Sequence, residues 1–409
     1  MPSFSIPVSG LQADSVALNT IGNNLANLNT TAFKKQETTF EDLFYQQMGA
    51  SGSGNPLQVG VGTRVSGTTA NFLQGTILPT GDPTDMALSG DGFFITEQGG
   101  VQALTRAGNF QLGSTGNLIT VDGASVMGYP VKNGVVDTNS SLAPISLPVG
   151  ITEGAQATGN ISISANLNAL ATVGTSFATP ATVYDSLGQS HAVTVSYTKT
   201  AANTWNYSVN LQSGDATGTP VNNTGTLSFG STGNLVSPSG SIAGITFPGM
   251  ANGSSDIVMS LNFFGANGNS TLTQSTVAST NTAAVQDGFP SGTYQSFAVD
   301  GNGVITASYS NGHKSAVGQV AVAKVTNPGG LTMTGHNSYT TTNASGDAIY
   351  GVAGSGGRAT IEASAVEQSN VDISAEFADL IVAQRSFEAN SKTVTAFDSI
   401  TQATLGMIR

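Results

Sequence analysis

The residue types that most often carry out chemistry are sparse in this chain. Asp185, Ser190 and His191 are the three types of a hydrolytic triad, but they fall within one short segment, whereas such triads draw on separate elements of a fold. The other histidines, His313 and His336, lack the spacing of metal ligands. The sequence has no cysteine, which excludes thiol nucleophiles, disulfides and iron–sulfur clusters. We therefore expect no catalytic residue, no metal site and no cofactor.

The glycine-rich segments offer no phosphate-binding loop. Gly329–Gly330 and two Gly-Ser-Thr-Gly-Asn turns lack the order of strand, loop and helix that holds a phosphate. The adjacent acids Glu41 and Asp42 fall on a predicted helix surface, where they are expected to be solvated. The sequence thus predicts a protein that is not an enzyme.

Charge and composition exclude some classes of binding partner. Lys and Arg number 12 against 24 Asp and Glu, the net charge is −12, and charged residues make up 9% of the 409, against about 25% in ordinary soluble domains. This balance argues against nucleic-acid binding and against a polybasic membrane anchor. No run reaches the roughly 18 apolar residues of a membrane span. Residues 1–10 hold no apolar run, so we expect no cleaved signal peptide.

Both ends of the chain are predicted to be long helices. Residues 9–48 contain no proline and two glycines, with apolar residues at heptad spacing that Asp14 interrupts. Residues 361–409 contain no proline and one glycine, with apolar residues every three or four positions. Such narrow stripes are typical of coiled coils, although packing of each end on its own globular domain stays open. The expected assembly residues are Leu11, Leu18, Ile21, Leu25, Leu28, Ile373, Phe377, Leu380, Phe387, Val394, Phe397, Ile400 and Leu405.

Between the two ends the pattern predicts β-structure. Apolar and polar residues alternate over 193–197 and 205–209, which predicts a hairpin, and over 257–263, which predicts a strand. Three related turn sequences, at 110–118, 227–235 and 297–305, supply the glycine and asparagine that tight hairpins need. The glycine-rich segments 49–55 and 351–357 are predicted to be flexible joints next to the terminal helices.

These elements predict a multidomain α + β protein, with paired, coiled-coil-like N- and C-terminal helices and two nested β-rich domains. One region stands out by composition, because Lys199 is the only Lys or Arg between Lys132 and Lys314. The predicted domains are a terminal helical core (1–70 plus 363–409), a β-rich middle domain (71–144 plus 285–362) and an inserted β-rich outer domain (145–284).

The terminal segments resemble the signatures of the bacterial flagellar axial proteins, which are the rod and hook subunits. Residues 9–35 (SGLQADSVALNTIGNNLANLNTTAFKK) resemble the N-terminal signature, and residues 368–409, with SNVD and QRSFEANSK, the C-terminal one. The hook subunits are the most similar, because rod subunits lack a large central insertion. The matching motif positions are Asn23, Asn24, Ala26, Asn27, Phe33, Lys34, Ser369, Asn370, Val371, Asp372, Gln384, Arg385, Asn390 and Ser391.

One position departs from the family's pattern. The family usually has glycine where this chain has Ala32. Because alanine adopts a positive φ at a cost, we expect a helical turn at this position. Near the other end, Gly406 is expected to loosen the last turn of the C-terminal helix.

The resemblance implies a structural subunit of the flagellar hook that self-assembles into a curved tube, the universal joint between rod and filament. The implied partners are further copies of the chain, the distal rod, the hook cap, the hook–filament junction proteins and the flagellar type III export apparatus. The implied location is the flagellum outside the cell. A distal-rod or junction component and a β-rich surface adhesin stay open. Since a lone pair of narrow-striped helices is marginal in water, we expect residues 1–70 and 363–409 to be largely disordered in the monomer.

Overall fold

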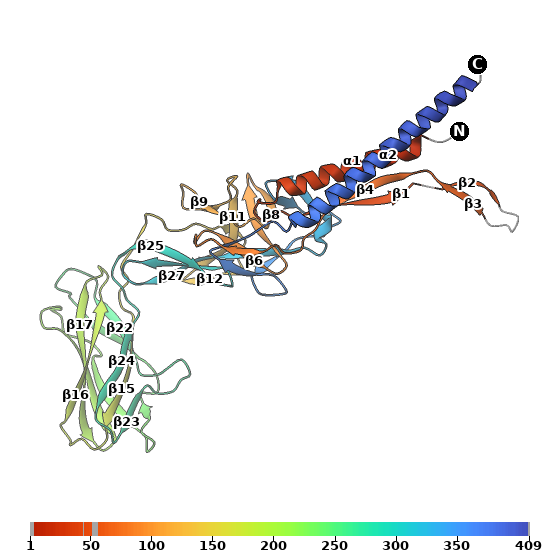
Figure 1. Ribbon diagram of the computed structural model, residues 1–409. Coiled ribbons are helices and arrows are strands. Elements are labelled where there is room, and N and C mark those ends of the chain that lie inside the picture. The colour runs from red at the N-terminus through yellow and green to blue at the C-terminus, as the bar shows by residue number, and fades with distance from the viewer. Residues whose placement is uncertain (1–3, 44, 51–55, 408–409) are drawn as a thin grey trace. The chain divides into compact units, whose positions relative to one another are not determined.

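The computed structural model describes residues 4–43, 45–50 and 56–407 of the chain. It is β-rich, with one helix near each end of the sequence (Figure 1), which confirms the predicted α + β class. The three-domain division and its borders stay a prediction. The chain separates into two compact units, unit 1 (Met1–Pro148, Phe297–Ala307 and Ser315–Arg409) and unit 2 (Val149–Ser296 and Ser308–Lys314).

The N-terminal helix is shorter than predicted. Helix α1 (Ser5–Ala26) ends well before residue 48, and β1 (Gln36–Asp42) and β2 (Tyr45–Ala50) follow it. The threonines and phenylalanine of β1 favour an extended backbone, so the acids of this segment, Glu41 and Asp42, lie on a strand and not on a helix surface.

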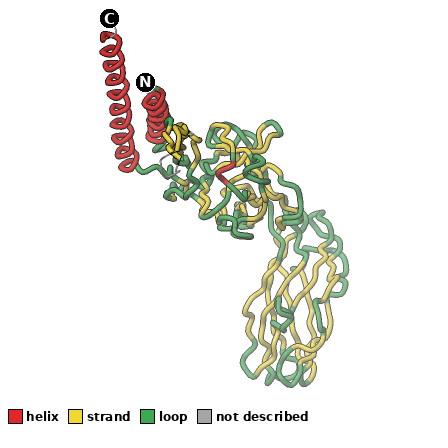
Figure 2. The backbone as a smooth tube through the Cα atoms, turned by 90° about the vertical axis from the view of Figure 1, so that its right-hand side faces the viewer, coloured by secondary structure: helices red, strands yellow, loops and turns green. Residues whose placement is uncertain are grey.

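The C-terminal helix also begins later than predicted. Strands β31 (Thr360–Ala363) and β32 (Ala365–Glu367) precede α2 (Ile373–Met407). The helix begins where the Asp372 carboxylate accepts the backbone N–H groups of Ser374 at 2.7 Å and Ala375 at 3.1 Å, which is an N-cap. It then continues through Gly406 to its last residue. Helices α1 and α2 lie side by side, and α2 extends beyond the start of α1 (Figure 2).

The flexibility predicted for the two glycine-rich segments, 49–55 and 351–357, stays a prediction. Gly49 and Ala50 are the last residues of β2, and 51–55 lie outside the described residues. Residues 351–352 belong to β30, and the turn that follows contains the buried Ala353 and three glycines of positive φ. This turn leads into β31 and not directly into a helix.

Unit 1 contains β-ribbons next to the helices and a larger sheet. Strand β1 pairs with β4 and β2 with β3, both antiparallel, while β31 pairs with β6 and β32 with β5. The larger sheet has the order β26-β27-β11-β7-β8-β29-β28, in which β26 is Val304–Tyr309. Its core includes Phe94, Phe110 and Val322. Strands β9 and β10 form the hairpin predicted at 110–118. The remaining strands of this unit are β3 (Pro56–Gly60), β4 (Thr63–Ala70), β5 (Ile77–Pro79), β6 (Met86–Ser89), β7 (Phe93–Gln98), β8 (Val101–Thr105), β9 (Gln111–Leu112), β10 (Leu118–Ile119), β11 (Ser125–Lys132), β12 (Val135–Val136), β13 (Ala143–Pro144), β28 (Thr332–Gly335), β29 (Ser338–Thr340) and β30 (Ile349–Val352). Strand β27 (Lys314–Lys324) belongs to this unit from Ser315 on.

Unit 2 is built from two sheets around one core. The first has the order β16-β17-β18-β19-β20, and the second β21-β22-β15-β23, with β24 also paired to β15. Trp205, Tyr197 and Phe263 are buried in the shared core, and the Trp205 indole N–H donates to Gln274 Oε1 at 2.9 Å. The predicted hairpins at 193–209 and 227–235 and the predicted strand near 257 are confirmed. The strands are β14 (Thr152–Glu153), β15 (Asn160–Asn168), β16 (Ser176–Tyr184), β17 (Ser190–Ala201), β18 (Thr204–Leu211), β19 (Thr224–Phe229), β20 (Leu235–Ser237), β21 (Ile242–Phe247), β22 (Ile257–Asn262), β23 (Leu272–Ser275) and β24 (Thr280–Gln286). Two further strands, β25 (Gly292–Val299) and β26 (Val304–Tyr309), form the hairpin predicted at 297–305, and each contains residues of both units.

Candidate assembly site

The two terminal helices contact each other in antiparallel order within unit 1. Asn24 near the end of α1 donates to Glu376 Oε2 near the start of α2 at 3.2 Å. Farther along, Asn390 Nδ2 donates to Asp14 Oδ2 at 2.8 Å. Phe4, directly before α1, meets Phe397 edge to face with ring centroids 6.0 Å apart. Since α2 has 35 residues and α1 has 22, the end of α2 after Phe397 has no partner turn on α1.

The buried positions of the helix pair are small or polar, and they are not the predicted apolar stripe. Ala13 and Asn24 on α1 and Glu376 and Ala383 on α2 are buried. Most of the predicted stripe is half-buried, namely Leu11, Leu18, Ile21, Leu25, Leu28, Leu380, Val394 and Phe397. The rest is exposed, from 38% at Phe387 to 63% at Leu405, with Ile373, Phe377 and Ile400 between these values. A single chain therefore leaves much of the stripe uncovered.

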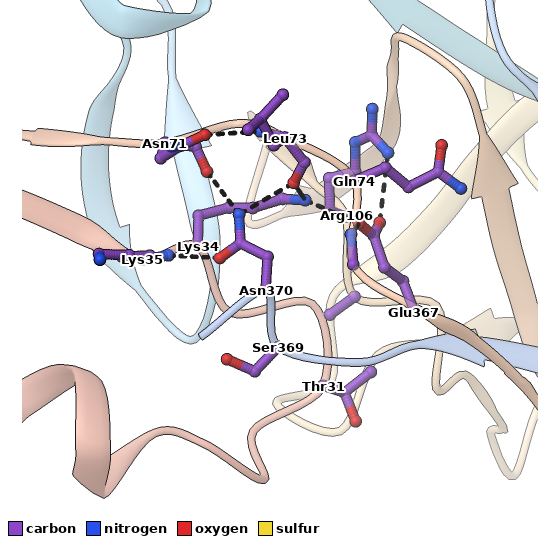
Figure 3. Close-up of polar contacts among 12 residues, drawn as sticks. Thr31, Lys34, Lys35, Asn71, Leu73, Gln74, Arg106, Glu367, Ser369 and Asn370 are labelled. Atoms are coloured by element: carbon purple, nitrogen blue, oxygen red, sulfur yellow. Dashed lines mark hydrogen bonds and ion pairs between the residues drawn. The ribbon is translucent and has the colours of Figure 1, made fainter. Parts of the chain in front are cut away.

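The segments that flank the helices are joined by a buried charge network (Figure 3). Lys34 Nζ lies 2.7 Å from Glu367 Oε1 and also donates to the Leu73 carbonyl at 2.8 Å. The same carboxylate accepts the Gly75 N–H at 2.8 Å and Arg106 Nη1 at 3.2 Å. Both ends of the Lys34–Glu367 pair are fully buried. Burial lowers the pKa of Lys34, and the Glu367 carboxylate opposes that shift.

Asn370 forms a second link between the two ends of the chain, also visible in Figure 3. Its Nδ2 donates to the carbonyls of Asn71 and Leu73, each at 2.9 Å, and its Oδ1 accepts the Lys35 N–H at 2.7 Å. An asparagine side chain supplies both donors and an acceptor for this geometry, which an aspartate could not. Two neighbouring motif residues, Phe33 and Val371, are buried.

Ala32 has φ +56° and lies in the left-handed region, so the prediction of a helical turn at this position was wrong. Its N–H donates to the Glu367 carbonyl at 2.8 Å, and the residue is fully buried. The hydrogen bond to β32 therefore requires a left-handed backbone at this position. Glycine adopts that conformation without the steric cost that alanine carries.

Asn24 connects α1 to both β1 and α2. Its Oδ1 accepts the Gln36 N–H and its Nδ2 donates to the Gln36 carbonyl, both at 2.9 Å, in addition to its bond with Glu376. Lys35 Nζ lies 2.8 Å from Glu376 Oε1, and this contact raises the pKa of Lys35. One amide thus pairs with two segments that are distant in the sequence.

The other motif residues have local roles or lie on the surface. Asn27 Nδ2 donates to the Asn23 carbonyl at 2.9 Å and satisfies the end of α1. Ser369 Oγ accepts the Val371 N–H at 3.4 Å. Arg385 pairs with Glu388 at 3.1 Å on the exposed face of α2. Ala26 and Gln384 are exposed, and Ser391 is half-buried.

Two residues of the network, Arg106 and Glu367, were missed by the sequence reasoning. Glu367 follows two apolar residues in a short strand. An acid in such a segment, with a lysine in the opposite terminal motif, could have indicated a buried ion pair. Arg106 had no signal in the sequence, because its contact with Glu367 joins residues 261 positions apart.

The triad residue types do not form a triad. In unit 2, His191 Nε2 lies 3.0 Å from Asp185 Oδ2, and His191 Nδ1 lies 3.0 Å from Asp215 Oδ2. Ser190 is exposed next to the buried His191 on β17, so the two side chains project from opposite faces of the strand. Across the described ranges, no group of three His, Asp or Glu residues could hold a metal ion, and none of the described helices is long and apolar enough to cross a membrane.

Comparisons with family models match four regions of the chain to one class. Four family models match successive regions: "Flagella basal body rod protein" (5–34), "Flagellar hook protein FlgE/F/G D1 domain" (87–170), "Flagellar basal body protein FlaE D2 domain" (155–289) and "Flagellar basal body rod FlgEFG protein C-terminal" (362–407). The helix pair and the β-rich units thus belong to an axial protein of the bacterial flagellum.

Full-length relatives identify the family within that class. The chain is 34% identical to the flagellar hook protein FlgE of Salmonella typhimurium, with 97% of this chain and 98% of the relative covered. It is 32% identical to FlgE of Borreliella burgdorferi, with 98% of each covered. The chain belongs to the FlgE flagellar hook protein family. It is a structural hook subunit and not an enzyme, as predicted.

A solved structure supports the fold. The crystal structure of Helicobacter pylori flagellar hook protein FlgE2 matches with a TM-score of 0.54 and 16% sequence identity, and the match covers 70% of this chain and 99% of that one. At this identity the likeness shows the fold alone.

Proposed function

We propose that the exposed apolar stripe of α1 and α2 drives polymerisation of the chain into the hook. The observation that carries this proposal is the mismatch between a long apolar stripe and the small, polar residues that the two helices bury against each other. Each large apolar side chain that a neighbouring copy covers contributes roughly 1.5–3 kcal/mol. A coiled-coil-like bundle of helices from several copies would complete what one pair leaves open.

The buried charge network fixes the segments from which α1 and α2 extend. Lys34, Glu367, Arg106 and Asn370 hold the first residues after α1 against the last residues before α2. Since β31 and β32 pair with strands of unit 1, we propose that the disorder expected in the monomer is centred on α1 and α2. The limits of 1–70 and 363–409 stay a prediction.

The specific role that we propose for the assembled hook follows from the family resemblance. The assembled tube is the universal joint between rod and filament, with the two β-rich domains nested between the terminal helices and turned outward. The partners are the distal rod, the hook cap, the hook–filament junction proteins and the type III export apparatus, and the location is outside the cell. Surfaces of Ser, Thr, Asn and Gly with few ion pairs suit a tube that bends, because contacts that slide then leave few unpaired charges.

Electron microscopy of polymerised protein tests the proposal. The full chain, concentrated in polymerising salt, is compared with a truncation that ends at Asp372 and with Phe377→Ser/Ile381→Ser. Both side chains of the double variant are exposed, so we expect the fold to tolerate the change. The matched control replaces two exposed apolar residues of unit 2, Leu170→Ser/Val173→Ser.

Curved tubes from the full chain and the control, with none from the other two samples, would support the proposal. Straight tubes would favour a distal-rod component. Tubes from the truncation would contradict the role of α2, and a full chain that forms no tube would favour the adhesin alternative.

A further inference from the structure

An open cleft of about 430 Å³ lies where α1, β1 and α2 meet in unit 1. Its walls include apolar side chains, among them Ile21 and the exposed Phe40 and Val382. Its charged lining is strongly acidic, with one cation, Lys35, and four acids: Asp14, Glu37, Glu376 and Asp379. Apolar walls with acids between them suit a lysine side chain, which has a methylene stem and a charged end.

The acids of the cleft are incompletely neutralised within one chain. Glu376 is 1% exposed, and its Oε1 has Lys35 Nζ, 2.8 Å away, as its only cationic partner in the described part of the chain. Asp379 is 60% exposed and lies 4.0 Å from the same lysine. One ammonium group thus faces two carboxylates, and the cleft can accept a second cation.

The chain itself offers a suitable cation on the same helix pair. Among the lysines and arginines that the structure describes, Lys314 and Lys392 have no side-chain hydrogen bond or ion pair, and Lys314 is in unit 2. Lys392 is exposed on α2, two positions after Asn390, whose side chain reaches α1. Two positions correspond to about 200° of rotation around a helix, so Lys392 projects away from α1.

Lys392 cannot reach the cleft of its own chain. It follows Asp379 by thirteen positions on one continuous helix, which is roughly 20 Å at 1.5 Å per residue. A second copy that lies beside the helix pair and is displaced along it by that distance would bring its Lys392 level with the cleft. Such a contact joins two different surfaces, and repetition of it builds an open filament.

We propose that Lys392 of one copy inserts into the acidic cleft of the next and pairs with Asp379 and Glu376. This inference rests on the proposed assembly through α1 and α2 and names one contact within it. Because apolar walls partly enclose the pair, its loss weakens assembly more than the loss of an exposed surface pair would.

The test measures the critical concentration for polymerisation of the full chain. Lys392→Glu is expected to raise it by about tenfold or more, because a carboxylate then faces the acidic cleft. Asp379→Lys is expected to raise it similarly, and the combined variant, Lys392→Glu/Asp379→Lys, to bring it back toward the wild-type value. Lys314→Glu makes the same charge change in unit 2 and is expected to leave the concentration unchanged.

A milder variant keeps the test independent of folding defects. Lys392→Gln changes one exposed side chain, and it is expected to raise the critical concentration and weaken its dependence on NaCl. If wild type polymerises but Lys392→Glu behaves like Lys314→Glu, or if the combined variant is not rescued, the contact is wrong while the proposed function stands. If wild type does not polymerise, the proposed function fails and the contact fails with it.

Discussion

Lys34 and Glu367 form an ion pair of 2.7 Å with both side chains fully buried, although 333 positions separate them in the sequence. Two charges removed from water are tolerated only when their remaining polar atoms are also satisfied. Here the Leu73 carbonyl, the Gly75 N–H and Arg106 supply those contacts. The pair therefore requires that the segments flanking both helices be in place together.

Replacement of Glu367 by alanine is expected to destabilise unit 1 strongly. The change leaves Lys34 and Arg106 buried without a counter-charge, which costs about 3–5 kcal/mol in proteins where one partner of a buried pair is removed. Denaturant unfolding of the full chain, compared with wild type, gives the difference in free energy. The control is Glu388→Ala, which breaks an exposed pair with Arg385 and is expected to change little. Equal effects of the two substitutions would show that the buried pair does not hold the ends together.

Ala32 provides a test of backbone strain. Its φ of +56° costs roughly 1–2 kcal/mol for a residue with a Cβ atom, while loss of the buried methyl group offsets part of that in Ala32→Gly. We therefore expect Ala32→Gly to leave the free energy of unfolding within about 1 kcal/mol of wild type. Ala32→Val adds a β-branched side chain at a buried left-handed position and is expected to cost more than 2 kcal/mol, about the upper range for overpacked cores. A valine variant as stable as the glycine variant would contradict this account.

The sequence pattern was sufficient for the class of fold and for the β hairpins of unit 2. Alternation at Val193, Val195 and Tyr197 depends on neighbours two positions apart, so a local pattern can show it. The ends of the helices were harder to predict from the sequence. The stretch after Ala26 lacks proline and glycine, but β1 forms there through pairing with β4, a partner that periodicity does not reveal.

The site was only partly predictable for a similar reason. Lys34 and Asn370 were identified through a family resemblance, and neither residue has a role that its neighbours in sequence indicate. Glu367, Arg106 and the left-handed Ala32 act through contacts between distant segments. Such contacts are properties of the folded backbone, and a single sequence gives no measure of them.

Unit 2 contains a pH-dependent contact at His191. Burial opposes the charged imidazole, but the carboxylates of Asp185 and Asp215 outweigh it and raise the pKa of His191 above 6.5. Burial likewise opposes ionisation of Asp185, and hydrogen bonds from His191, Asn252 and the backbone outweigh it, so the pKa of Asp185 lies below 3.8. Both ring nitrogens lie 3.0 Å from carboxylate oxygens, an arrangement that favours the doubly protonated ring.

The signs of these shifts define a pH window for unit 2. The His191 contribution is complete below pH 6.5 and is lost as the pH rises through the raised pKa, whereas the Asp185 contribution is present above pH 3.8 and is lost as the pH falls. Thermal unfolding is therefore expected to occur at lower temperature as the pH rises from 6 to 9. His191→Gln is expected to remove that decline. An identical pH dependence in wild type and variant would show that His191 carries no charge linked to folding.

Helices α1 and α2 are expected to gain order when copies assemble. In the single chain the stripe stays largely uncovered, and a helix pair that buries small and polar residues has little apolar area to offset about 1–2 kcal/mol of backbone entropy per residue. Amide hydrogen exchange is expected to be fast at Leu18 and Phe387 in the monomer and slow in the polymer. The internal control is Leu88, fully buried in the core of unit 1, where exchange is expected to be slow in both states. Slow exchange at Leu18 in the monomer would show that the helix pair is stable without neighbours, and polymerisation would then join preformed helices.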